Sequence, residues 1–178
     1  KSFTDRNAVK RDLEIMIKAA LKAGIPVIIG TAGGSGGDPH LAWNEKIIEE
    51  IARENGLSFR MALIHAEVPK EVETKGIDNG KVKPLHPAPK PSAAEVAETV
   101  RIVGQMGLEP FIKALDTGVQ VILAGRAYDP SVFAALPVKK GFDKGLAIHM
   151  GKILECACIA ATPGSGSDCM LGTLREDH

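Results

Sequence analysis

Ile25-Pro26-Val27-Ile28-Ile29-Gly30 is a short, continuous run of mainly β-branched residues. Such a run predicts a strand that is buried on both faces, as in a parallel sheet. Five glycines follow within residues 30–37, and apolar residues then recur at helical spacing over residues 41–55. The succession of strand, loop and amphipathic helix is the first half of a βαβ unit.

The same alternation continues along the chain. Strands are predicted at residues 59–64 and 119–124, and helices at residues 5–23, 92–106, 110–116 and 143–161. This order predicts a single α/β domain over residues 1–178, with three layers: a mostly parallel, Rossmann-like sheet flanked by helices. Because three strands are few for such a sheet, we expect the chain to be an incomplete fragment, truncated at both ends.

Residues 68–91 interrupt the alternation. They contain Pro69, Pro84, Pro87, Pro89 and Pro91, together with two glycines. This composition predicts a long, irregular excursion from the domain, with the character of a lid.

The composition excludes several classes of partner. Lys plus Arg and Asp plus Glu both number 22, so the net charge is zero, and aromatic residues make up only 4%. We therefore expect neither a nucleic acid nor a membrane as partner, and no apolar run approaches the roughly 20 residues that span a bilayer. Cys156, Cys158 and Cys169 form no disulfide framework, which favours the reducing cytoplasm.

Polar segments follow each predicted strand, at residues 30–40, 65–67 and 125–130. In open α/β sheets, ligands bind outside the carboxyl ends of the strands. The sequence therefore places a functional site at this edge of the sheet.

The glycine-rich loop is the most unusual of these segments. Its exposed N–H groups, next to a helix N-terminus, predict a cradle for a phosphate, a carboxylate or an acyl-CoA diphosphate. A dinucleotide fingerprint fails because Pro39 occupies its third glycine position, and no phosphate-loop lysine is present. The alternative is a flexible turn in which Asp38 caps the next helix. The predicted ligand-binding residues of this loop are Gly33, Gly34, Ser35, Gly36, Gly37 and Asp38.

Three side chains of the first two segments are candidates for proton transfer: His40, His65 and Glu67. His65 and Glu67 are two residues apart, so in extended backbone they face the same side and could form a base with its orienting group, or two metal ligands. A hydrogen-bonded turn is the alternative.

Arg126 and Asp129 follow the third strand. An arginine there is suited to bidentate recognition of a ligand carboxylate, with Asp129 orienting it. A purely structural Arg–Asp pair is the alternative.

The last predicted helix presents His149, Lys152 and Cys156 at spacings of three and four, on one face. His149 and Lys152 are predicted catalytic residues, and a thiol beside them could ionise easily and act as a nucleophile. An exposed Lys152–Glu155 pair with structural cysteines is the alternative. The spacing of Cys156 and Cys158 is not that of a zinc site, so we assign no metal site.

Three motifs together resemble one known family: residues 30–40, residues 121–130 and residues 149–156. The chain is similar over nearly its whole length to the acyclic terpene utilisation protein A family. Members are larger, with an additional N-terminal strand and loop and a long C-terminal portion. The resemblance implies a cytoplasmic role in the catabolism of branched, terpenoid-type acyl compounds, beside acyl-CoA carboxylases.

We therefore expect an enzyme, or its core, of the lyase, hydratase or isomerase type that acts on a small carboxylate or acyl-CoA. The sequence requires no cofactor, although acyl-CoA or a divalent metal could bind, and we expect a homo-oligomer. One alternative is a non-catalytic binding or assembly subunit. The other is a metal-dependent hydrolase, in which Asp38, His40, His65 and Glu67 would have to converge.

Overall fold

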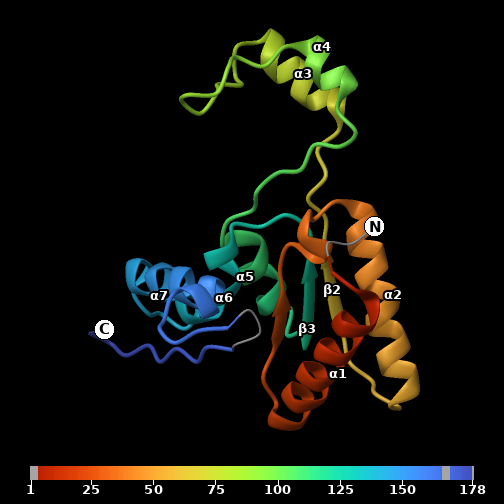
Figure 1. The fold of residues 1–178 in the computed structure, drawn as a ribbon, viewed down its shortest axis with the longest axis vertical. Coiled ribbons are helices and arrows are strands. Elements are labelled where there is room, and N and C mark those ends of the chain that lie inside the picture. Colours follow the sequence, from red (N-terminus) through yellow and green to blue (C-terminus); the bar gives the residue numbers. More distant parts are fainter. Residues whose placement is uncertain (1–3, 166–168, 178) are drawn as a thin grey trace.

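The computed structural model describes residues 4–165 and 169–177. Its centre is a parallel sheet of three strands in the order β1-β3-β2 (Figure 1). Val27 of β1 and Met61 of β2 both pair with Val121 of β3, one on each side. The strands are β1 (Val27–Ile29), β2 (Met61–Ile64) and β3 (Val121–Ala124).

Helices cover both faces of the sheet. Successive residues of a strand point to opposite faces, so alternate residues of β3 belong to two separate cores. Val121 and Leu123 pack in one core with α1 and α2, whereas Ile122 and Ala124 pack in a second core with α5, α6 and α7. The predicted three-layer α/β fold is confirmed. These helices are α1 (Arg6–Ala23), α2 (Asp38–Glu54), α5 (Glu109–Asp116), α6 (Asp129–Lys139) and α7 (Lys144–Cys156).

The ends of α1 follow from local chemistry. Asp5 caps the helix, since its carboxylate accepts hydrogen bonds from the N–H groups of Asn7 and Ala8. Gly24 ends it in the left-handed conformation, at φ +67°. The predicted bounds of this helix are confirmed to within one residue.

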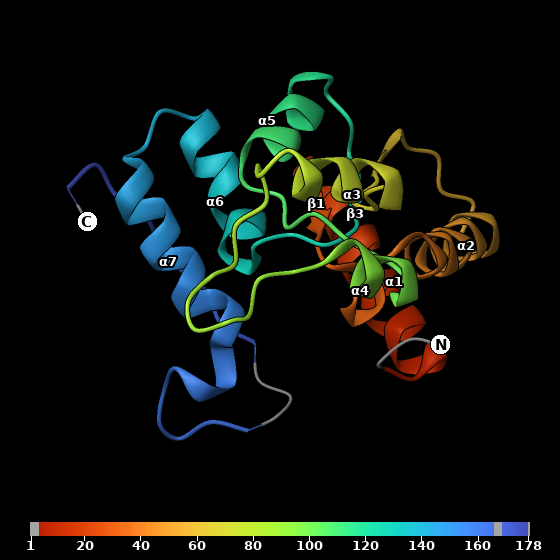
Figure 2. The same cartoon turned by 90° about the horizontal axis from the view of Figure 1, so that it is seen from above.

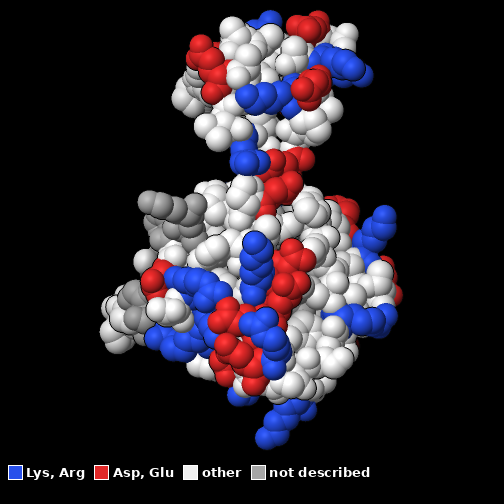
Figure 3. All heavy atoms as spheres, turned by 90° about the vertical axis from the view of Figure 1, so that its right-hand side faces the viewer, with Lys and Arg blue, Asp and Glu red and all other residues white. Residues whose placement is uncertain are grey.

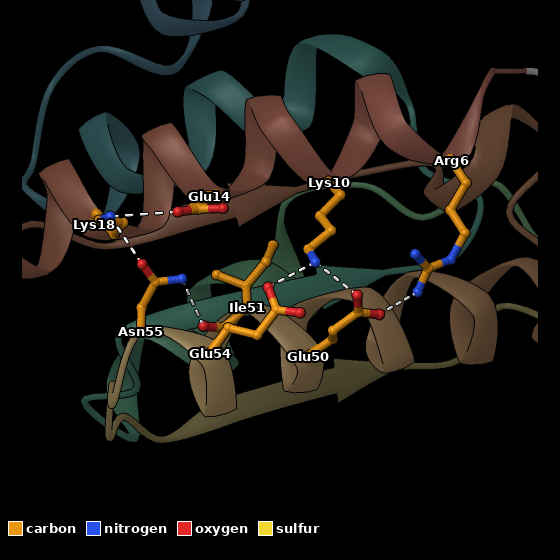
Figure 4. Close-up of polar contacts among 8 residues, drawn as sticks. All are labelled: Arg6, Lys10, Glu14, Lys18, Glu50, Ile51, Glu54 and Asn55. Atoms are coloured by element: carbon orange, nitrogen blue, oxygen red, sulfur yellow. Dashed lines mark hydrogen bonds and ion pairs between the residues drawn. The ribbon is translucent and has the colours of Figure 1, made fainter.

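Ion pairs join α1 to α2 along their exposed side (Figure 4). Lys10 lies 2.6 Å from a carboxylate oxygen of each of Glu50 and Glu54, and Arg6 also pairs with Glu50. These cations lower the pKa of Glu50 to about 2, mainly through the hydrogen bonds from Arg6 and then Lys10. Figure 3 shows the resulting mixture of positive and negative side chains on this side of the molecule.

Residues 68–102 form an arm that stands away from the body on a narrow neck (Figures 1 and 3). It contains α3 (Lys70–Asp78) and α4 (Ala93–Glu98), which pack against each other. The prediction that residues 68–91 lack regular structure is therefore wrong for α3. The helix predicted at residues 92–106 stops at Glu98, because the chain then extends back toward the body. Ser92 and Glu95 form a reciprocal capping box at the start of α4.

Two helices on the face of the sheet that carries Ile122 and Ala124, α6 and α7, differ from the sequence prediction. The last helix ends at Cys156 rather than residue 161, and a short 3₁₀ helix, Ala157–Ile159, follows. α6 was not predicted, because it lies between the sheet and α7 and has no clear polar stripe; its Ala134 and Ala135 are fully buried. Within the described residues, no helix has the length and apolar character needed to cross a membrane.

Candidate functional site

The three loops at the carboxyl ends of the strands meet through their backbones. The N–H of Arg126 donates to the carbonyl of Gly36 at 3.1 Å. A Cβ on Gly36 would lie 2.2 Å from that nitrogen, and a Cβ on Gly125 would lie 2.7 Å from the Cβ of Ala66. Only glycine permits these approaches, so the loops after β1, β2 and β3 form one packed unit.

Thr31 ties the first loop to the third. It has a left-handed backbone, at φ +51°, which is rare for a β-branched residue. Its hydroxyl oxygen accepts a hydrogen bond from the N–H of Ala127 at 3.2 Å and lies 3.4 Å from a carboxylate oxygen of Asp129. Backbone strain of this kind clusters at functional sites, where surrounding contacts hold it in place.

His65 and Asp38 form a hydrogen-bonded pair at this edge, which we call the dyad. Nδ1 of His65 lies 2.8 Å from Oδ1 of Asp38. His65 directly follows β2, and Asp38 is the first residue of α2, so two rigid elements position the pair. A carboxylate oxygen only accepts hydrogen bonds, so Nδ1 carries the hydrogen, and in the neutral imidazole the lone pair is then on Nε2. The His65 side chain is 63% exposed, which leaves it accessible to a ligand.

Glu67 does not serve as the orienting group that the sequence suggested for His65. Its carboxylate accepts a hydrogen bond from the backbone N–H of Asp38 at 2.8 Å and two from Nη1 of Arg101, at 2.8 and 2.9 Å. Glu67 thus occupies the N-terminus of α2, where a negative charge is favoured. The structure brings Glu67 beside the dyad, but as a support for the backbone of Asp38.

The glycine-rich loop directs several of its N–H groups inward. The N–H groups of Ser35 and Gly36 both donate to the carbonyl of Ala32, and that of Gly34 donates to the carbonyl of Thr31. Gly33 lies under the side chain of His40, where a Cβ would come within 2.8 Å of it. These three N–H groups are already paired within the loop, so they do not point at a bound anion. Anion binding by residues 33–37 stays a prediction.

Arg126 is half-buried beside the loop, and its Nη2 donates to the carbonyl of Gly34 at 2.9 Å. A guanidinium has five N–H donors, and this contact uses one. Asp129 instead contacts Thr31, from the first turn of α6. Arg126 and Asp129 therefore serve different partners, and Arg126 keeps donors with which it could hold an anion.

The candidates on α7 lie apart from the dyad, because α6 separates α7 from the sheet (Figures 1 and 2). His149 lines an apolar pocket of about 290 Å³ between α7 and residues 170–174. Lys152 pairs with Glu155. The structure does not bring either residue to the strand ends.

The thiol of Cys156 differs from the sequence prediction. It donates to a carboxylate oxygen of Glu155 at 3.1 Å, and this hydrogen bond, followed by burial, raises its pKa. Lys152 acts in the opposite direction, but more weakly. The contact with Glu155 therefore gives no support to an easily ionised nucleophile at this position.

Two further observations concern what the sequence suggested and what it missed. The described residues contain no group of three or more His, Cys, Asp or Glu side chains arranged to hold a metal ion, so the metal-dependent alternative gains no geometric support.

The sequence analysis missed Arg101, which contacts Glu67. The helix predicted over residues 92–106 concealed the extended segment that brings Arg101 back to the body. The available signal was the pairs of β-branched residues on either side of Arg101, Thr99-Val100 and Ile102-Val103.

The chain was compared with known protein families, with curated proteins and with solved structures. Searches of curated proteins and of solved structures returned none. The family model described as "Acyclic terpene utilisation family protein AtuA" matches residues 5–168, which include all three strands, the glycine-rich loop, the dyad and the arm. Since the match extends over most of the chain, the chain belongs to the acyclic terpene utilisation family AtuA.

Proposed function

We propose that this chain is the core of an enzyme that moves a proton on the carbon next to a carbonyl group, in a small carboxylate or acyl-CoA. The observation that supports it most directly is the dyad: an exposed imidazole whose Nδ1 is held by a carboxylate at 2.8 Å. An imidazole oriented in this way presents Nε2 as a general base.

The proposed proton transfer needs no oxidant, reductant or cofactor. Nε2 of His65 takes the proton, and the electron pair of the broken C–H bond moves onto the carbonyl oxygen as an enolate. The imidazolium returns the proton to the same carbon, to the γ-carbon of a β,γ-unsaturated substrate in an isomerase, or to a hydroxyl group that leaves the β-carbon as water in a lyase or hydratase. Asp38 stabilises the imidazolium, and the remaining N–H donors of Arg126 bind the negative charge of the substrate.

Family membership supports the class of substrate. The family is described by acyclic terpene utilisation, so a branched, apolar acyl group is the natural candidate. We also propose that the enzyme works in the cytoplasm, where free thiols such as Cys156 and Cys169 stay reduced.

The experiment is deuterium exchange in heavy water. The protein is incubated with branched acyl-CoA thioesters and with the free acids, and deuterium at the carbon next to the carbonyl is measured by mass spectrometry. We expect exchange with the wild type and a loss of about 10²–10⁴-fold in His65→Gln, the range for removal of a general base. Asp38→Asn should lose activity through its effect on the orientation of the imidazole.

The control is His86→Gln, which changes an exposed histidine in the arm. It should exchange deuterium at the wild-type rate. Exchange that persists in His65→Gln would refute the role of the dyad, and wild-type protein without exchange on any tested thioester or acid would refute the proposed reaction.

The arm favours a second candidate function, assembly with further copies of this chain. Leu85 is 86% exposed and Val100 is 90% exposed, and Val96 is the buried hydrophobic side chain of the arm. Apolar side chains exposed on a projecting element are typical of contact surfaces. A homo-oligomer should appear in light scattering as a multiple of the monomer mass, and Leu85→Asp with Val100→Asp should reduce it to the monomer. A wild-type monomer would refute this candidate.

A further inference from the structure

Arg101 is the arm residue that reaches the dyad region. It lies on the returning leg of the arm, and Nη1 contacts both carboxylate oxygens of Glu67, at 2.8 and 2.9 Å. Its side chain is 47% exposed, whereas that of Glu67 is 23% exposed. The contact therefore lies at the boundary between the arm and the body.

Glu67 transmits this contact to Asp38. The oxygen that binds Arg101, Oε1, also accepts the backbone N–H of Asp38 at 2.8 Å. The side chain of the same aspartate holds His65. A continuous series of hydrogen bonds thus runs from Arg101 through Glu67 and Asp38 to the imidazole.

The base of the arm reinforces the series. The N–H of Val68 donates to Ile102 at 2.9 Å, and that of Gly104 donates to Ala66 at 2.8 Å, so the two legs form a short antiparallel ribbon. Ala66 directly follows His65 in sequence. The position of the arm therefore constrains both the backbone beside His65 and the carboxylate that supports Asp38.

Space at this point is closely filled. A Cβ on Gly37 would lie 3.2 Å from Oε1 of Glu67 and 3.4 Å from Cδ of Arg101. The glycine-rich loop ends here at the start of α2, and the ion pair rests against it. This packing, together with the contact of one guanidinium nitrogen with both carboxylate oxygens, fixes the direction of the Glu67 carboxylate more firmly than an isolated exposed ion pair would.

We propose that Arg101 is a positioning residue that couples the placement of the arm to the geometry of the dyad through Glu67. The role of the dyad in catalysis rests on the proposed function, but the coupling itself is structural. Arg101 does not touch the reacting atoms. Its guanidinium fixes the carboxylate of Glu67, and that carboxylate binds the backbone N–H of Asp38. The Asp38 side chain in turn holds the imidazole of His65 in one tautomer.

The test reads the tautomer of His65 directly. Ring ¹⁵N chemical shifts of the whole protein are recorded, and His65 is assigned by the signal that His65→Gln removes. The wild type should carry its hydrogen on Nδ1. Arg101→Gln should give a mixture of both tautomers, and Glu67→Gln should do the same with the arginine intact. Arg101→Lys, which keeps the charge, should restore part of the Nδ1 form.

A second readout separates positioning from general stability. In the deuterium-exchange assay, Arg101→Gln should lower kcat about 10-fold with little change in KM, by analogy with the 10–100-fold effects of residues that orient a reacting group from behind. The matched control, Arg53→Gln, removes an exposed arginine from α2 and should change neither kcat nor the ring shifts.

The outcomes are distinguishable. Wild-type ring shifts in a folded Arg101→Gln protein would overturn the coupling, whatever the enzyme does. Should Arg101→Gln fail to fold, Glu67→Gln with wild-type ring shifts would overturn it instead. Altered ring shifts in a protein without any exchange activity would support the coupling and count against the proposed function.

Discussion

The carbonyl of Gly36 accepts the N–H of Arg126 at 3.1 Å, in a contact that brings the backbones of two strand-end loops together. Gly36 has φ +73°, and a Cβ there would lie 2.2 Å from the Arg126 nitrogen. The atoms that a Cβ would meet belong to the backbone of Arg126 and Gly125, which cannot move aside as a side chain could. The contact between the two loops therefore requires that residue 36 has no Cβ.

Gly36→Ala should therefore be strongly destabilising. The left-handed backbone costs about 1–2 kcal/mol for a residue with a Cβ, and overpacking against the backbone adds about 1–3 kcal/mol. Gly56→Ala is the matched control, because Gly56 has φ +61° with nothing within 4 Å of its Cβ position. Urea unfolding should give a markedly larger loss for Gly36→Ala. Equal losses for the two variants would show that the close approach has no energetic consequence.

The ion pairs between α1 and α2 should make stability depend on pH in the acid range. The pKa of Glu50 is lowered to about 2, below its unfolded value near 4.5. Its stabilising effect is therefore fully present above pH 4.5 and is lost as the pH falls toward 2. Unfolding by urea should show a deficit in Glu50→Gln at pH 6 that shrinks toward pH 2. Glu49→Gln, an exposed neighbour on α2, serves as the control. A deficit independent of pH would contradict the role of these ion pairs.

The reactivity of Cys156 should rise when Glu155 is neutralised. Glu155 raises the thiol pKa, whereas the charge of Lys152 lowers it. Because alkylation requires the thiolate, iodoacetamide at neutral pH should modify Cys156 faster in Glu155→Gln and more slowly in Lys152→Gln. Peptide mass spectrometry measures both rates, with the exposed Cys169 as internal reference. The opposite order of rates would mean that this carboxylate does not control the thiol.

The arm should respond to its helix cap without a change in the body. Ser92 and Glu95 form a reciprocal capping box at the start of α4. Ser92→Ala should cost about 1 kcal/mol. Because α4 packs on α3, amide hydrogen exchange should accelerate in α3 and α4 and stay unchanged in α5. Faster exchange in α5 as well would show that the arm and the body unfold together.

The sequence predicted the layers of the fold well, because the continuous run at residues 121–124 and the periodic helices on both sides leave few alternatives. Tertiary contacts determined what it missed. α6 shows no clear periodicity because the sheet covers one side and α7 the other. The helix predicted over residues 92–106 stops early because the segment after Glu98 is extended, where Ile102 pairs with Val68 and Gly104 pairs with Ala66.

That polar side chains gather at the strand ends could be predicted from the sequence, but their pairing could not. The spacing of His65 and Glu67 suggested that these two side chains contact each other. In the structure His65 contacts Asp38 instead, and Glu67 contacts Arg101. Partners 27 and 34 residues apart in sequence leave no local pattern, since the fold alone brings them together. Residues on α7 were included because a helical face can be read from sequence, whereas the layer that it faces cannot.

The ribbon at the base of the arm makes the arm a separable insertion in the fold. Val68 and Ile102 are hydrogen-bonded neighbours, so the chain leaves the body and re-enters it at almost the same point. An insertion between two adjacent residues of a hairpin leaves the order of the sheet strands unchanged. The arm can therefore be lengthened or shortened without a change in the order of the three strands. In the laboratory, a short turn joining Val68 to Ile102 should yield a minimal body that still folds.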